Sequence, residues 1–317
     1  MAWRKFEAPP RRPMADRRRD ITSLEIRKVR FDFDGEIPFI WNPRNPTFSV
    51  FTNAVSIIAI AFEKLIVTAT REAIPLITDA EAKSEAEAFL RQEAQHANAH
   101  RQHVHALARR HPGLEQTLAD TVRCFDRLTD SAPLDFRLAY TANLEATFTP
   151  YFKLLLDNEA TLFAPGDERV ASLFLWHFVE EVEHRSSALV VYDSLIRSRT
   201  RRVRALPAIL RHMNEAFMIV VDGFNTHVPE ADRIIDARRA LPAMSLSARR
   251  RPRPAPPALG HLSTRQKGVA LLRILESQSP WHNPTHQPLP LFADRWFHRY
   301  EVGADIAHWY TATAGAQ

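Results

Sequence analysis

The chain has 317 residues, 45% of them hydrophobic and 25% charged, which is typical of a globular protein with a sizeable buried core. Its eight glycines are too far apart for a G-x-G-x-x-G, Walker A or G-x-S-x-G motif, which excludes dinucleotide-fold, P-loop and α/β-hydrolase enzymes. A single cysteine excludes an intrachain disulfide, a thiolate zinc site and an iron–sulfur cluster, so any metal must be held by nitrogen and oxygen.

The net charge of +5 is concentrated in two segments. Residues 1–20 hold seven basic side chains against three acidic ones, and four arginines lie within residues 249–253. The rest of the chain is therefore slightly negative. This distribution predicts a disordered, solvated tail over residues 1–20 and no nucleic-acid partner.

The sequence carries no clear membrane signal. No apolar stretch follows the N-terminal arginines, as a secretion signal would require. The longest uncharged run, residues 45–62, is 18 residues long but contains Pro46 and several polar side chains, and it continues directly into Glu63. This favours a helix buried inside a protein over one that spans lipid. We therefore expect a cytoplasmic protein without stable membrane insertion.

Few glycines and long stretches of 3.6-residue periodicity predict an all-α protein. After an irregular lead-in over residues 26–47, we expect a first helix over about 48–73 and a second over 79–110, ending at a Pro-Gly breaker. The third covers 114–129 and 134–157, with Pro150 as a kink, and the fourth runs from 168 to about 198. These elements predict a four-helix bundle.

Further helices are expected after the bundle, over about 200–222, 262–278 and 290–310. A proline- and arginine-rich segment, 241–260, indicates a linker or extended arm. The predicted organisation is a basic tail (1–20), a helical bundle with a di-metal site (21–225), a linker (226–260) and a C-terminal helical extension (261–317).

Two Glu-x-x-His pairs mark candidate metal ligands, Glu93/His96 on the second helix and Glu181/His184 on the fourth. Residues three apart lie on one face of a helix, so each pair can offer a carboxylate and an imidazole to one ion. A solvated helix face is the alternative for each pair. Their positions on two different long helices favour the metal site.

The other two long helices each carry one glutamate in an apolar surround, Glu63 and Glu145. A lone carboxylate that faces a core is costly unless it is paired, protonated or bound to a metal. A surface position paired with Lys64 or Arg71 is the alternative for Glu63. Two single glutamates and two Glu-x-x-His pairs on four successive helices are the ligand set of ferritin-like di-iron and di-manganese proteins. This donor set favours iron or manganese, with zinc as an alternative.

Two strings of sequence resemble the signature segments of a bacterial family labelled "predicted metal-dependent hydrolase", whose members are ferritin-like. The strings are QEAQHANAHR at residues 92–101 and WHFVEEVEHR at residues 176–185, and the resemblance covers about residues 25–225. It implies a ferritin-like bundle and carries over Glu93, His96, His100, His177, Glu181, His184 and Glu145. Glu63 is less typical, because the family commonly has Gly-Glu-Arg where this chain has Phe62-Glu63-Lys64.

Further histidines surround these motifs. His177 lies within about a 60° arc of Glu181 and His184 on the same helix and can be a seventh ligand, an arrangement that resembles di-iron arylamine N-oxygenases. His100 lies on the inward arc as either a ligand supporter or a core histidine. Glu180 and Asn143 are weaker candidates for supporting roles. Three further histidines lie among arginines and are expected to be exposed: His103 and His105 on the second helix, and His111 directly after it.

Two enzyme classes fit this site. The first is a non-haem di-iron or Fe/Mn carboxylate oxygenase, an oxidoreductase that activates O₂ to oxidise a small organic substrate with electrons from a donor. The alternative is a dinuclear hydrolase in which two metals lower the pKa of a bridging water. Glu93 and Glu181 are the expected bridging ligands, with Glu63 and Glu145 terminal. Metal storage is disfavoured, since a storage subunit would not need the C-terminal extension. The oligomeric state stays open, with a homodimer as one option.

Overall fold

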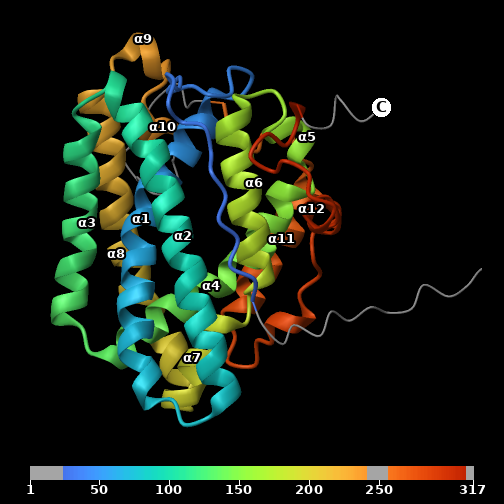
Figure 1. The fold of residues 1–317 in the computed structure, drawn as a ribbon. Helices are drawn as coiled ribbons and strands as arrows, with labels where there is room; N and C mark the ends of the chain where they lie inside the picture. Colours follow the sequence, from blue (N-terminus) through green and yellow to red (C-terminus); the bar gives the residue numbers. More distant parts are fainter. Residues whose placement is uncertain (1–23, 241–255, 312–317) are drawn as a thin grey trace, which may run out of the picture.

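The computed structural model describes residues 24–240 and 256–311, and all regular secondary structure in these residues is helical (Figure 1). This confirms the prediction of an all-α bundle. The basic tail over residues 1–20 and the four arginines at 249–253 lie outside the described residues.

Four helices form the bundle that positions the predicted ligands: α1 (Pro46–Ala73), α2 (Ala80–Arg110), α4 (Leu134–Leu156) and α6 (Glu168–Glu183). In this bundle α1 packs on α2 and α4, and α6 packs on α4 and α2. Polar caps fix where three of them begin, because Asn45, Asp79 and Asp167 each accept a hydrogen bond from a first-turn backbone N–H. The start of each helix thus sets which side chains face inward.

The fourth helix is interrupted, whereas the sequence predicts one helix to about residue 198. It ends at Glu183, and His184 forms its cap with non-helical dihedrals (φ −90°, ψ 17°). The backbone N–H of Ser187 then bonds to the carbonyl of His184 at 2.8 Å, which tightens the turn before α7 (Ser187–Ile196). The reason is tertiary, since α7 packs on α2 and α4 and no glycine or proline marks the break.

The remaining helices surround the bundle. α3 (Leu114–Ser131) and α8 (Arg199–His227) pack on each other and against α1. α11 (Thr264–Ser277) packs on α4, while α12 (Leu291–Glu301) is shorter than the expected helix over 290–310. The short helices are η1 (Ile74–Leu76), α5 (Glu159–Leu162), α9 (Glu230–Arg233), α10 (Ala237–Ala240) and η3 (Pro284–His286).

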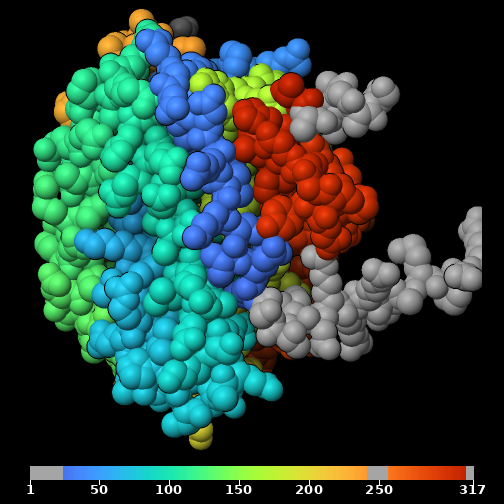
Figure 2. Space-filling view, viewed as in Figure 1, coloured from blue at the N-terminus to red at the C-terminus, as the bar shows by residue number. Residues whose placement is uncertain are grey.

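The segment over residues 24–45 has neither helix nor strand and runs along the outside of the bundle, between α2 and the C-terminal region (Figures 1 and 2). Its aromatic side chains are nevertheless buried, among them Phe31, Phe33 and Trp41. Phe31 lies 5.5 Å from the ring of Trp176 on α6. The segment therefore covers the side of the bundle on which α2 and α6 meet.

One helix of the described residues, Pro46–Leu76 including η1, is long and apolar enough to cross a membrane. However, 78% of its most apolar window is buried inside the fold, as expected for the central helix of a bundle. Its composition is explained by packing on the neighbouring helices.

Candidate metal centre

The structure brings all seven predicted ligands together in the middle of the bundle. Their donor atoms form two groups, each lying within 4.8 Å, and both groups contain Glu181. The first group is Glu63, His96, His177 and Glu181, and the second is Glu93, Glu145, Glu181 and His184. All seven side chains are buried. Six of them come from inward helix faces and His184 directly follows α6, so the helical spacing in the sequence explains most of their convergence.

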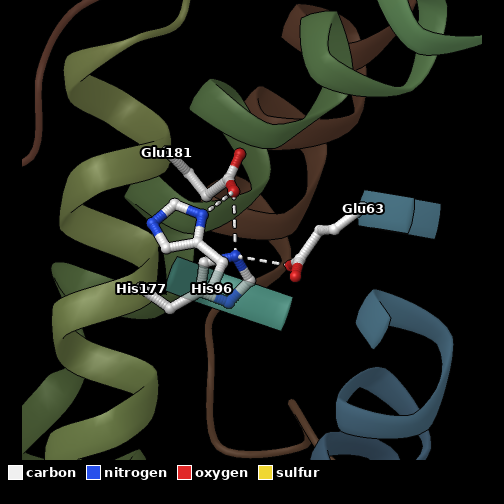
Figure 3. Close-up of side chains that lie close together, drawn as sticks. All are labelled: Glu63, His96, His177 and Glu181. Atoms are coloured by element: carbon white, nitrogen blue, oxygen red, sulfur yellow. Dashed lines mark hydrogen bonds and ion pairs between the residues drawn. The ribbon is translucent and has the colours of Figure 1, made fainter. Parts of the chain in front are cut away.

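The first group joins α1, α2 and α6 (Figure 3). Nε2 of His177 lies 2.8 Å from Oε1 of Glu181 and 3.4 Å from Oε1 of Glu63. Nδ1 of His96 lies 3.3 Å from the same Glu181 oxygen. Two imidazole nitrogens and two carboxylates therefore point toward a common centre.

The second group lies around the end of α6. Nε2 of His184 lies 3.1 Å from Oε1 of Glu93, 3.2 Å from Oε2 of Glu181 and 3.5 Å from Oε2 of Glu145. The helix therefore breaks at His184, the residue whose imidazole lies beside three carboxylates. One imidazole and three carboxylates form this group.

Glu181 connects the two groups, since its Oε1 faces the imidazoles of the first group and its Oε2 faces His184. Glu93 also spans them, with Oε1 close to His184 and Oε2 3.9 Å from Nδ1 of His96. The two carboxylates expected to bridge are therefore the two that reach both groups.

The donor set fits two divalent cations. Five buried oxygen and nitrogen atoms of the cluster have no hydrogen-bond partner: Oε2 of Glu63, both oxygens of Glu93, Oε1 of Glu145 and Nδ1 of His96. Buried polar atoms without partners are costly, and a metal ion would satisfy them. Four ionised glutamates would also balance the charge of two divalent ions, while neutral imidazoles complete the coordination.

In the absence of metal, burial and the close packing of the cluster shift the pKa values of its own carboxylates. Burial, together with neighbouring carboxylates, raises the pKa of Glu145 to about 8 and raises the pKa of Glu63 and Glu93 well above the ordinary value. Burial alone would also raise the pKa of Glu181, but His184 and His177 outweigh it and hold that pKa well below its ordinary value. The carboxylate shared by both groups is thus the one that stays ionised.

Each imidazole of the cluster is held at its outer nitrogen by a polar group. Nε2 of His96 donates to Oε2 of Glu180 at 3.0 Å, which leaves Nδ1 to face the first group. Nδ1 of His184 donates to Oε1 of Gln92 at 3.1 Å, which leaves Nε2 to face the second group. Such outer contacts fix the tautomer and the ring orientation of a metal-binding histidine.

Arg27 extends this support to the N-terminal segment. Its Nη1 lies 3.1 Å from Oε1 of Glu180 and 2.6 Å from Oε2 of Glu183. The guanidinium also lies over the rings of Trp296, Phe297 and Tyr300 on α12, at 5.0–5.7 Å from their centroids. The C-terminal extension therefore packs on the residue that neutralises Glu180.

Two of the histidines expected to be exposed are buried. His103 has no exposed surface and His111 is 3% exposed, whereas the side chain of His105 is 50% exposed. The prediction for His103 and His111 was wrong because neighbouring arginines do not reveal which way a helix turns its face. His103 is seven residues beyond His96 and so lies on the same inward arc.

The supporting candidates have different outcomes. His100 is buried and its Nε2 lies 2.7 Å from Nδ1 of His177, so it supports that imidazole. Asn143 bonds to Arg202 of α8, through its Oδ1 and its amide. Sequence reasoning missed Arg27 and Gln92. Gln92 could have been found as the residue before Glu93, but nothing near Arg27 in the sequence indicates its partners.

A cavity of about 540 Å³ lies beside the break between α6 and α7. Its lining includes Ser84 and Glu85 of α2, together with Glu183, Arg185 and Ser186. Oε2 of Glu183 accepts a hydrogen bond from Gln92 at 3.1 Å, and Gln92 in turn holds His184. Two hydrogen bonds, made through Gln92, therefore connect Glu183 in the cavity wall to the imidazole of His184.

Comparison with known proteins gives one family match. The family model described as "Predicted metal-dependent hydrolase" matches residues 25–259, about three quarters of the chain. No curated protein and no solved structure matches significantly. All seven residues of the cluster lie within the matched range, whereas α11 and α12 lie beyond it.

Proposed function

Since the chain belongs to the family of predicted metal-dependent hydrolases, we propose that it hydrolyses a small-molecule substrate at a dinuclear metal centre. The observation that carries this proposal is the pair of buried donor groups joined by Glu181. Two metal ions bound there would lower the pKa of a shared water for attack on an ester, amide or phosphate. Zinc, manganese and iron all suit the donor set.

The protein's own residues would hold the centre rigid and dry. Glu180 and Gln92 fix the outward nitrogens of His96 and His184, so these rings need no reorganisation during a reaction. Phe89 packs on His184 and Trp176 on His96, each with ring centroids 5.0 Å apart. Such an apolar surround excludes bulk water and strengthens the electrostatic interactions within the site.

We propose that the substrate approaches through the cavity beside the α6–α7 break. Ser84 lines this cavity and is exposed, so a larger side chain can be placed there without disturbing the core. Ser84→Trp should lower kcat/KM about 10-fold or more while leaving the metal content unchanged. Unchanged turnover in this variant would refute the approach route and leave the metal assignment intact.

The function is tested with purified protein stripped of metal and reloaded with Zn²⁺ under anaerobic conditions. We expect turnover of at least one member of a panel of ester, amide and phosphate substrates, and loss of that turnover in Glu181→Gln. Glu87→Gln is the matched control, since Glu87 is exposed on α2 and belongs to neither donor group. Lack of turnover across the panel, with both ions bound, would contradict the hydrolase proposal.

A second candidate is an O₂-activating oxygenase with two irons or an iron–manganese pair, which would oxidise a small organic substrate. Complete burial favours it, because each of the seven donors is at most 3% exposed and O₂ is small enough to reach an enclosed site. It would require an electron donor. O₂ consumption by the reduced, iron-loaded protein, together with no anaerobic turnover of the zinc form, would select this function over hydrolysis.

We further propose that the protein acts in the cytoplasm on a small molecule, without a nucleic-acid partner or stable membrane insertion. The burial of α1 supports this, since its apolar surface is used in packing. The charge distribution supports it as well, because the arginine-rich segments at residues 1–20 and 249–253 are separate in sequence from the seven ligands.

A further inference from the structure

A row of buried polar side chains leads away from His177 along α1 and α2. Nδ1 of His177 lies 2.7 Å from Nε2 of His100, and Nδ1 of His100 lies 2.9 Å from Oγ of Ser56. The same Ser56 oxygen lies 2.8 Å from Nδ1 of His103. Ser56, His100 and His103 have no exposed surface. We call these three residues the Ser56 relay.

The Ser56 relay differs from the supports of the other two imidazoles. Glu180 and Gln92 present oxygen atoms, which can only accept, so His96 and His184 must donate from their outer nitrogens. Nε2 of His100 can either donate or accept. The tautomer of His177 therefore depends on the tautomer of His100.

Binding of a metal by His177 would fix the direction of every hydrogen bond in the row. Nε2 of His177 must then carry no proton, so Nδ1 donates to Nε2 of His100. His100 in turn carries its proton on Nδ1 and donates to Ser56. The Ser56 hydroxyl has one proton, which it donates to Nδ1 of His103.

Among the described residues, nothing at the far end of the row imposes the opposite direction. His103 must carry its proton on Nε2, and that nitrogen is buried without a hydrogen-bond partner. Its ring lies 5.5 Å from that of Phe33 in the N-terminal segment and 6.1 Å from that of Phe174 on α6. No donor beside this nitrogen therefore forces the His103 proton onto Nδ1, which would reverse the row.

We propose that Ser56, backed by His103, is a positioning residue that stabilises the tautomer in which His177 can bind a metal, because its hydroxyl accepts the Nδ1 proton of His100. This inference rests on the metal centre of the proposed function, but not on whether the reaction is hydrolysis or oxidation. Without the Ser56 hydroxyl, the Nδ1 proton of His100 would have no acceptor in the metal-binding arrangement, which favours the tautomer in which His100 donates to His177. Nε2 of His177 then keeps its proton, which points at Glu181 2.8 Å away, and the first donor group loses a ligand.

The experiment measures metal affinity in the full-length protein. Ser56→Ala should weaken one of the two stepwise Zn²⁺ dissociation constants by about 10- to 100-fold, as measured by competition with a chelator, and change the other little. Ser56→Thr keeps the hydroxyl and should restore the affinity. Ser49→Ala is the matched control, because Ser49 is equally buried on α1 but its hydroxyl accepts from the backbone N–H of Asn42.

A second measurement uses the unmodified protein. Long-range ¹H–¹⁵N spectra of the zinc-loaded form should show His100 protonated on Nδ1 and His103 protonated on Nε2. Either opposite tautomer would overturn the proposal, as would Zn²⁺ affinities in Ser56→Ala equal to those of Ser49→Ala. Absence of Zn²⁺ binding by the unmodified protein would instead refute the metal centre itself, so the two failures are distinguishable.

Discussion

Replacing Arg27 with methionine removes the charge that Glu180 faces in the interior. The side chain of Arg27 is 3% exposed and that of Glu180 is fully buried, with a nitrogen–oxygen distance of 3.1 Å. At an effective dielectric constant of about 20, this distance corresponds to an attraction of about 5 kcal/mol. Removal of one partner of a buried pair typically costs about 3–5 kcal/mol. We expect Arg27→Met to lower the free energy of unfolding of the metal-free protein by about 3–5 kcal/mol, as measured by urea denaturation.

The same substitution should weaken metal binding, because Glu180 accepts the proton of His96. Without Arg27, Glu180 can draw that proton toward itself or turn away, and the His96 imidazole loses its fixed orientation. We expect a fall of about 10-fold or more in Zn²⁺ affinity. Arg127→Met is the control, since its exposed pair with Glu215 should contribute only about 0–1 kcal/mol and leave the affinity unchanged.

A double-mutant cycle separates the ion pair from simple packing. Combining Arg27→Met with Glu180→Gln removes the unpaired charge along with its partner, so the double variant should lose less stability than the two single variants together. The reasoning would be refuted by additive losses, or by a loss below about 1 kcal/mol in Arg27→Met. Additive losses would mean that Arg27 contributes through its contacts with α12 and not through Glu180, and a small loss would mean that it contributes little through either.

Three other predictions concern the cluster and its surroundings. Glu181→Gln should abolish binding of both metals, since Glu181 belongs to both groups, and retention of two ions by elemental analysis would contradict the shared role. Burial lowers the pKa of His103 to about 3, partly offset by Asp167, while its unfolded pKa is about 6.5. Between about pH 6.5 and pH 3 the His103 imidazole takes up a proton only on unfolding, so the free energy of unfolding falls by up to about 1.4 kcal/mol for each pH unit in this range. We therefore expect His103→Gln to reduce the loss of stability at acid pH, as measured by urea denaturation. Deletion of residues 1–20 should leave the metal content unchanged, and loss of metal would show that the tail contributes to the centre.

The sequence alone indicates which residues form the cluster, because the spacing that identifies them lies within single helices. Helical periodicity places Glu93, His96 and His100 on one face of α2, and the same rule places His177 and Glu181 on one face of α6, with His184 directly after its end. Once four such helices pack with their polar faces inward, convergence follows from the need to pair buried carboxylates. The limits of α2 were predictable for the same reason, since the cap at Asp79 and the Pro-Gly breaker after Arg110 act within a few residues.

Only the tertiary structure decides which residues support the cluster. Arg27 meets Glu180 across 153 residues, and it does so from a segment with no periodicity to predict its path. The burial of His103 and His111 depends on what packs over α2, which arginine neighbours in the sequence do not reveal. The break after His184 and the contact of Ser56 with two histidines likewise depend on neighbouring helices. Such contacts join residues far apart in the chain, and local sequence does not determine the path that brings them together.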